Sequence, residues 1–199
     1  MNHVKLALDD IADLRAYERR RDEYRDRIIA LKKVRRVGVG PIVTLVFENR
    51  ETIRFQVQEM ARAEKLITDE QIRTELDIYN PLIPEPGQLS ATLFIELTSK
   101  LALLDWLPRL VGIERSLELR IGGEAVPNVV DEAHAQQLTR EEVTASVHYV
   151  RFELNAHQVE RFAAAPVELA VNHPNYQHEA PLAEETRQSL LGDLRGNLD

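Results

Sequence analysis

The stretch from Pro41 to Lys65 constrains the fold most, because its apolar pattern changes from a period of two to a helical period. Apolar residues occupy every second position in two runs: Val43, Leu45 and Phe47, then Ile53, Phe55 and Val57. Such alternation is typical of strands with one buried face. The two buried faces match only if the connection around Asn49 has an odd number of residues. We therefore predict a hairpin over residues 43–58, followed by a helix over residues 59–67.

Polar side chains crowd the same stretch and form the candidate binding site. On a covered sheet face, Arg54 would need a carboxylate partner or an anionic ligand, and Glu59 or Glu96 could then act as an acid or base beside it. The alternative is a solvated sheet face, on which each ion pair contributes about 1 kcal/mol or less. The predicted ligand- or partner-binding residues are Glu48, Arg54, Gln56, Gln58, Glu59, Arg62, Glu64 and Glu96.

The rest of the chain mixes helices and strands without a regular alternation. Apolar residues at spacings of three and four predict a long N-terminal helix over residues 9–33, which a turn at residues 37–41 ends. Thr68 and Gln71 have the spacing of a capping box at the start of another helix. Further strands are predicted over residues 89–97, 117–121, 125–130, 145–154 and 167–171, and further helices over residues 99–111, after Asn155 and over residues 182–194. The predicted fold class is α+β, with a mostly antiparallel sheet packed with helices.

Length and composition indicate an ordinary globular protein. The chain has 199 residues, of which 44% are hydrophobic and 29% charged, and it can bury a core without a disulfide or a metal. We predict a single domain over residues 1–199, with two lobes meeting near residues 112–116 as the alternative. The sequence contains no Cys, which excludes disulfides, cysteine nucleophiles and metal or iron–sulfur sites with thiolate ligands.

Charge and hydropathy limit the kinds of partner. The net charge of −8 argues against a general nucleic-acid binder, which needs clustered Lys and Arg. The arginines of the first helix alternate with acidic residues, as in the i,i+4 pairs Arg19–Glu23 and Glu23–Arg27, so a solvated, ion-paired helix is predicted there. The sequence has no run of about 18 apolar residues, so no membrane span is predicted, and no signal-peptide pattern precedes the first charged residues. A cytoplasmic location is expected.

The histidines offer little for catalysis or metal binding. His173 and His178 are the weak candidates for metal ligands, but two imidazoles fall short of the three or four ligands that a divalent metal needs. The preferred interpretation is a loop shaped by Pro174, in which Tyr176 anchors the last helix. His148 shares a predicted strand face with apolar residues, so we predict a hydrogen-bonded core histidine. No cofactor is predicted.

Four segments resemble a family of bacterial proteins catalogued as a domain of unknown function, DUF3501. They are FENRETIRFQVQEMARAE, ELDIYNPLIPEPGQLSATLFIEL, VNHPNY and RQSLLGDL. The resemblance spans nearly the whole chain and is densest over residues 41–97. Genes of that family are often found beside rubrerythrin and an iron–sulfur oxidoreductase, which implies a part in peroxide or redox metabolism, but the family brings no assigned activity. Residues matching its most recognisable segment are Glu48, Phe55, Gln56, Glu59, Arg62, Glu64, Tyr79, Asn80, Thr92 and Glu96.

These observations leave three functional hypotheses open. The first is a non-catalytic accessory protein of a redox system, which binds a protein partner through the polar residues and the N-terminal helix. The second is an enzyme or a binding protein for a small anionic ligand, which uses Arg54 with Glu59 or Glu96. The third is a metal protein that uses His173 and His178. A homo-oligomer is compatible with all three hypotheses.

Overall fold

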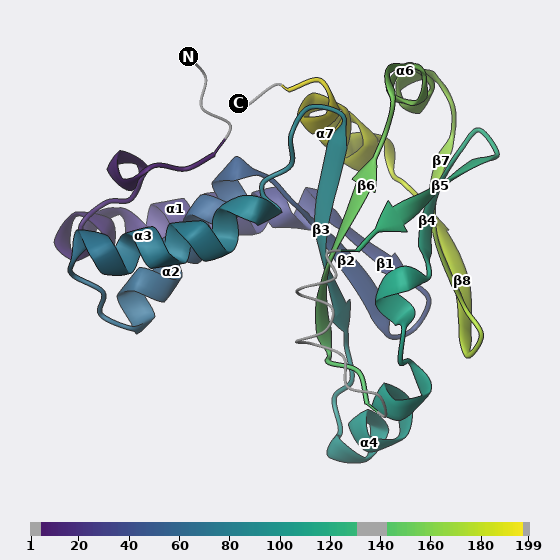
Figure 1. The fold of residues 1–199 in the computed structure, drawn as a ribbon, viewed down its shortest axis with the longest axis horizontal. Helices are drawn as coiled ribbons and strands as arrows, with labels where there is room; N and C mark the ends of the chain where they lie inside the picture. Colours follow the sequence, from purple (N-terminus) through teal and green to yellow (C-terminus); the bar gives the residue numbers. More distant parts are fainter. Residues whose placement is uncertain (1–4, 131–142, 197–199) are drawn as a thin grey trace.

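The computed structural model describes residues 5–130 and 143–196, which form a curved sheet with helices on its outside (Figure 1). The described strands make one eight-stranded sheet in the order β1-β2-β3-β6-β5-β4-β7-β8, and every neighbouring pair is antiparallel. The strands are β1 (Arg36–Val39), β2 (Val43–Glu48), β3 (Gln88–Ile95), β4 (Leu117–Ile121), β5 (Glu124–Val129), β6 (Val147–Glu153), β7 (Val167–His173) and β8 (Tyr176–Pro181). The α+β prediction with a mostly antiparallel sheet is therefore confirmed.

The sheet curls until its two ends meet, so that it is nearly a barrel. The Tyr176 hydroxyl donates a hydrogen bond to the Val39 carbonyl at 2.6 Å and accepts from the amides of Ile42 and Val43 at 3.2 and 3.3 Å. Gly40 makes this approach feasible, because its φ is +74° and a Cβ there would lie 2.5 Å from the same hydroxyl oxygen. One side chain on β8 thus joins the last strand to the β1–β2 turn.

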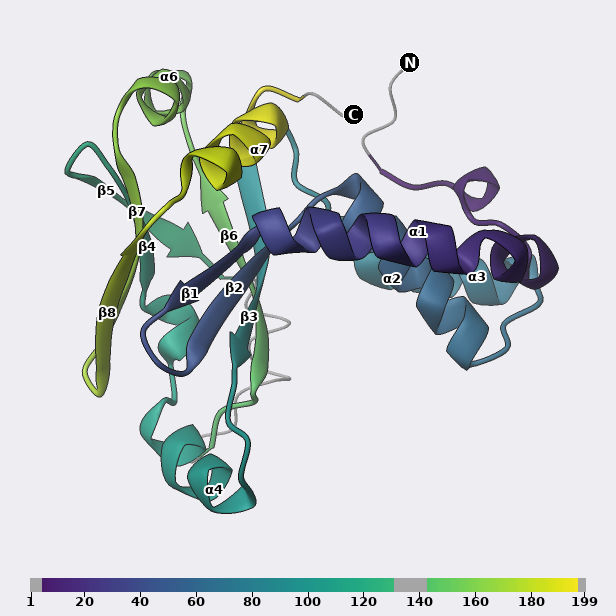
Figure 2. The same ribbon diagram turned by 180° about the vertical axis from the view of Figure 1, so that it is seen from behind.

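The helices cover different parts of the sheet. The two views show α1, α2 and α3 packed together on one side of β1–β3, whereas α4 lies beyond one end of the strands, and α6 and α7 lie at the other end (Figures 1 and 2). Short 3-10 turns, η1 (Leu8–Asp10), η2 (Asn80–Leu82) and η3 (Ile113–Arg115), connect these elements. The helices are α1 (Leu14–Val34), α2 (Arg50–Ala63), α3 (Asp69–Tyr79), α4 (Lys100–Arg109), α6 (Ala156–Ala164) and α7 (Glu184–Leu194).

Two apolar clusters hold the described residues together. The larger lies inside the sheet and contains Phe47, Leu93, Leu119 and Phe152, each fully buried. The smaller lies among the helices and consists of Leu6, Ile53, Val57, Leu76, Leu82 and Ile83. Residues 112–116, the predicted meeting point of two lobes, form a turn and η3, whose Ile113 is fully buried in the larger cluster. The division into one or two units stays a prediction.

The predicted hairpin over residues 43–58 is wrong in its second half. Residues 43–48 form β2 as expected, but residues 50–63 form α2. The Asn49 side chain accepts from the Thr52 amide at 3.0 Å, and Thr52 Oγ1 accepts from the Asn49 amide at 2.9 Å, which completes a capping box. The real hairpin partner of β2 is β1, in the segment predicted as a turn.

Most other predicted elements are present. The long N-terminal helix, the helix capped by Thr68, the helix capped by Asn155 and the strands β3 to β7 all form within a few residues of their predicted bounds. The predicted loop after His173 is limited to a turn at residues 174–175, because residues 176–181 form β8. Tyr176, predicted to anchor the last helix, instead bonds through its hydroxyl to the β1–β2 turn. Within residues 5–130 and 143–196, no helix is both long enough and apolar enough to cross a membrane, as the sequence predicts.

Candidate anion-binding pocket between helices α1 and α2

Helix α2 organises the candidate site, because its buried stripe determines where its polar residues point. Ile53, Val57 and Ala61 recur at a spacing of four and are buried. Side chains on either side of this stripe then contact different neighbours. The polar residues that sequence analysis grouped as one candidate site therefore lie in different surroundings.

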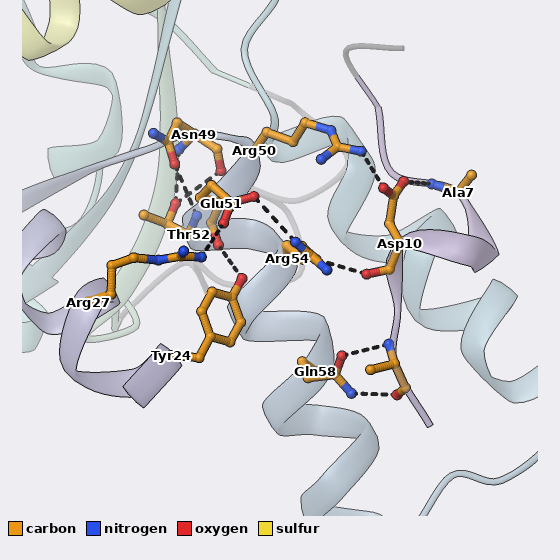
Figure 3. Close-up of polar contacts among 11 residues, drawn as sticks. Ala7, Asp10, Tyr24, Arg27, Asn49, Arg50, Glu51, Thr52, Arg54 and Gln58 are labelled. Atoms are coloured by element: carbon orange, nitrogen blue, oxygen red, sulfur yellow. Dashed lines mark hydrogen bonds and ion pairs between the residues drawn. The ribbon is translucent and has the colours of Figure 1, made fainter. Parts of the chain in front are cut away.

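One row of α2 side chains holds the N-terminal segment (Figure 3). Arg50 forms an ion pair with the Asp10 carboxylate at 2.7 Å, and Arg54 Nε donates to the Asp10 carbonyl at 2.8 Å. Gln58 is 2% exposed; its amide nitrogen donates to the Ala12 carbonyl at 2.9 Å, and its amide oxygen accepts from the Ala12 N–H at 3.0 Å. Three α2 side chains, each four residues from the next, thus hold the N-terminal segment through polar contacts, most of them with its backbone.

A second row pairs with α1. The Glu59 carboxylate accepts from the Tyr17 hydroxyl at 2.6 Å and from two nitrogens of Arg21 at 2.8 Å each. The hydrogen bonds from Arg21 lower the pKa of Glu59, in spite of its partial burial. Burial and the bond to Glu59 raise the pKa of Tyr17, so the phenol stays protonated. Arg62 pairs with Glu18 at 2.5 Å near the other end of α2.

Between these two rows lies a pocket of about 190 Å³. The ring of Tyr24 lines this pocket, and the guanidinium carbons of Arg27 and Arg54 lie 5.0 and 5.8 Å from the ring centroid. Burial raises the pKa of Tyr24 to about 12, and its neutral hydroxyl donates to the Glu51 carbonyl at 3.4 Å. The lining residues are Ala12, Tyr17, Arg20, Glu23, Tyr24, Arg27, Arg54 and Gln58.

The pocket has an excess of positive charge. Arg20, Arg27 and Arg54 line it against the single carboxylate of Glu23. Glu51, just outside, pairs with Arg27 at 3.1 Å and lies 3.7 Å from Arg54. Arg20 makes no hydrogen bond or ion pair with the rest of the described chain. Guanidinium groups bind carboxylates through paired N–H donors, so this pocket is suited to an anionic group.

The other predicted site residues lie elsewhere. Glu48 and Gln56 line a second cavity between α2 and the sheet. Glu96 follows β3 at the opposite end of β2, where Thr44 Oγ1 donates to its carboxylate at 2.8 Å and Arg36 pairs with it. Glu64 is the exposed C-cap of α2. The structure therefore brings together Arg54 and Gln58, and separately Glu48 and Gln56.

The candidate metal ligands also have other roles. His173 is buried at the end of β7, with Nε2 at 3.0 Å from the Val111 carbonyl. His178 is exposed on β8, and its ring lies 4.4 Å from that of Tyr176. Within the described parts of the chain, no three His, Asp or Glu residues are grouped so that they could hold a metal. His148 is a buried, hydrogen-bonded core residue as predicted, and burial lowers its pKa.

Sequence analysis expected the N-terminal helix to take part in binding but did not identify which of its residues contribute. Arg20, Tyr24 and Arg27 recur at spacings of four and three, so they share one face of the helix. That spacing was the available signal. It does not distinguish this face from the other charged faces of the helix, because Glu18, Asp22 and Arg25 recur at the same spacings of four and three.

Comparisons with known proteins identify the family but no activity. The family described as "Protein of unknown function (DUF3501)" matches residues 5–194. A crystal structure at 1.90 Å resolution of a "novel protein of unknown function" from Burkholderia pseudomallei K96243 is 38% identical in sequence, with a TM-score of 0.88. The match covers 96% of this chain and 99% of that one. No curated protein matches the sequence.

Proposed function

Since the chain belongs to the family described as "Protein of unknown function (DUF3501)", we propose a function from its geometry: it is a cytoplasmic, non-catalytic accessory protein that binds an acidic group of a partner protein in the pocket between α1 and α2. The observation that carries this proposal is the group of three arginines that line the pocket: Arg27 and Arg54 lie over the Tyr24 ring, and Arg20 has no hydrogen-bond or ion-pair partner within the described residues.

The remaining polar residues of α2 support a binding role over catalysis. Glu59 and Glu96, the predicted acid or base partners of Arg54, are both held by other donors. Hydrogen bonds from Arg21 lower the pKa of Glu59, and the bond from Thr44 lowers the pKa of Glu96. Both groups are therefore stabilised as carboxylates, whereas a general acid at neutral pH needs a raised pKa.

The redox setting of the proposal comes from the family resemblance. The resemblance implies a gene neighbourhood that often contains rubrerythrin and an iron–sulfur oxidoreductase, so these two proteins are the first partners to test. A chain without Cys cannot hold an iron–sulfur cluster through thiolates. An accessory role, in which the partner carries the redox centre, is consistent with that composition.

Isothermal titration calorimetry with a purified rubrerythrin and a purified iron–sulfur oxidoreductase, the two partners that the resemblance implies, tests the proposal. The informative variant is Arg20→Glu, because Arg20 lines the pocket and makes no hydrogen bond or ion pair with another described residue. Arg19→Glu is the matched control, since Arg19 is an exposed neighbour on the same helix outside the lining. We expect one of the two proteins to bind, Arg20→Glu to weaken binding at least about tenfold, and Arg19→Glu to change it less than about twofold.

Two outcomes would contradict the proposal. If neither protein binds, or if the two charge reversals weaken binding equally, the pocket is not the docking site. Succinate is added as a competitor to distinguish a small-ligand site: tight binding of succinate in the absence of either protein, lost in Arg20→Glu, would replace the partner by a small anionic ligand.

A further inference from the structure

A second cavity, of about 210 Å³, lies on the other side of α2. It is bounded by β2, β3 and β6 of the sheet and by the three helices α1, α2 and α3. Its chemistry differs from that of the first pocket, because it combines one buried carboxylate with aromatic rings. The residues that carry the argument are Lys32, Glu48, Tyr79, Thr92, Phe94 and Tyr149.

Glu48 is the unusual member of this lining. The residue is 5% exposed, and its Oε1 accepts a hydrogen bond from Thr92 Oγ1 at 2.8 Å. Its Oε2 is buried and has no hydrogen-bond partner among the described residues. Lys32 Nζ lies 3.9 Å from Oε2, beyond hydrogen-bond distance. A buried carboxylate oxygen without a donor is costly, so the protein leaves a place for an outside donor there.

The rings around Glu48 suit a positive charge. Tyr79, Phe94 and Tyr149 all line the cavity. The faces of aromatic rings are electronegative and attract ammonium groups, most strongly where water is excluded. Burial, followed by the proximity of Tyr79 and Glu48, raises the pKa of Tyr149, so this ring stays neutral at physiological pH.

We propose that this cavity binds a small organic cation, namely a protonated amine on an apolar body. The ammonium group donates to Glu48 Oε2 and lies against the aromatic rings, while the body packs on the apolar lining supplied by Ile53 and Leu82. Lys32 is the internal competitor for the carboxylate, and its side chain is 33% exposed, so it can turn toward solvent when the ligand enters. This inference does not depend on the proposed partner-binding function.

Titration with three ligands of one shape, followed by two-dimensional amide NMR, tests the proposal. Benzylamine is charged at pH 7, benzyl alcohol is neutral, and benzoate is negative. We expect benzylamine to shift the amides of residues around the cavity and to bind at least about tenfold more tightly than benzyl alcohol, with no binding of benzoate. Comparable binding of benzoate would overturn the proposal.

Variants assign the effect to Glu48. Glu48→Gln keeps the shape but removes the charge, and we expect it to weaken benzylamine binding at least tenfold. Glu96→Gln is the matched control, because Glu96 also accepts from a threonine across β2 and β3 but is exposed and paired with Arg36. Lys32→Met removes the competing ammonium and is expected to strengthen binding.

Thermal unfolding of each variant establishes that it is folded before titration. The proposal is overturned if a folded Glu48→Gln protein binds benzylamine as well as the wild type does. It is also overturned if benzylamine shifts no amide near the cavity, which would mean that water alone meets Glu48 Oε2.

Discussion

The sheet is stabilised differently from the helical layer, by which we mean α1, α2, α3 and the N-terminal segment that packs on them. Inside the sheet, fully buried apolar side chains such as Leu119 and Phe152 form one continuous cluster. Between α1, α2 and the N-terminal segment the apolar cluster is small. Polar contacts from Gln58 to the N-terminal segment, and from Glu59 and Arg62 to α1, add to it. Apolar burial is non-directional, whereas each of these polar contacts needs its own partner.

This difference shows that a dense group of polar residues can be structural. Sequence analysis interpreted the polar residues of 48–64 as one binding surface, yet the carboxylate of Glu59 and the amide of Gln58 are fully engaged inside the protein. The binding candidates are polar groups that have no partner within residues 5–130 and 143–196, such as the guanidinium of Arg20 and Oε2 of Glu48.

The largest effect is expected at the junction of the two regions. Arg35 is 1% exposed and donates to the carbonyls of Phe47 and Glu48 at 2.8 and 3.1 Å, and it pairs with Asp193 of α7. Arg35→Met leaves the buried Asp193 without its partner, so we expect urea unfolding to show a loss of about 3–5 kcal/mol.

A double variant tests the reason for this loss. Arg35→Met combined with Asp193→Leu removes both charges, and we expect it to recover much of the stability, because apolar residues can replace a buried ion pair. If the double variant is as unstable as the single one, the bonds to the β2 carbonyls matter more than the charge of Asp193.

The next largest effect is expected at Gln58. Gln58→Leu removes both hydrogen bonds to the Ala12 backbone, and the unpaired groups cost about 1–3 kcal/mol. Hydrogen exchange should become faster in residues 5–13 while the strands keep their protection. Gln56→Leu, on the same helix but without such bonds, should change stability by less than about 0.5 kcal/mol. Equal protection of residues 5–13 in the two variants would contradict this prediction.

We expect the stability of the helical layer to depend on pH through Glu59. Its pKa in the folded protein is below the ordinary value of 4.5, so its stabilising effect is present above that value and is lost as the pH falls through the folded pKa. Glu59→Gln should therefore be less stable than the wild type by about 1–2 kcal/mol at pH 7, and the difference should vanish in acid. Urea unfolding from pH 7 to pH 3 measures it; a difference independent of pH would rule out the charge as its source.

The smallest effect is expected for the pair of Arg62 and Glu18. Their side chains are 39% and 51% exposed, so water and salt screen the charges. Arg62→Ala should cost less than about 1 kcal/mol. A double-mutant cycle with Glu18→Ala measures the coupling, and its decrease at high salt would confirm an exposed ion pair. A coupling above about 2 kcal/mol would show that this end of the helical layer is more rigid than its exposure indicates.

The fold was largely predictable where pattern and local chemistry agreed. Alternation located β2 and β3, and Thr68 and Asn155 marked the starts of α3 and α6. The second half of the predicted hairpin failed because Ile53 and Val57 satisfy both a period of two and a helical spacing of four. The cap at Asn49 decides in favour of the helix, and its partner is Thr52 instead of the usual Glu or Gln.

The site was only partly predictable, because its members meet through tertiary packing. Arg54 and Gln58 were selected, but their partners on α1 and in the N-terminal segment were not. Glu48 and Gln56 were also selected, whereas Tyr79 and Thr92, which line the same cavity, were not selected as site residues. These four residues come from four separate elements, β2, α2, α3 and β3, so no local spacing connects them.

The closure made by Tyr176 has a consequence for association between copies of the chain. Strands β1 and β8 are the two edges of the described sheet, and an edge strand exposes unpaired backbone groups that can add a strand from another molecule. Because the Tyr176 hydroxyl satisfies the Val39 carbonyl and the edges face each other, neither edge offers a long flat template. The hydroxyl of one side chain therefore helps to protect the protein against aggregation through its sheet.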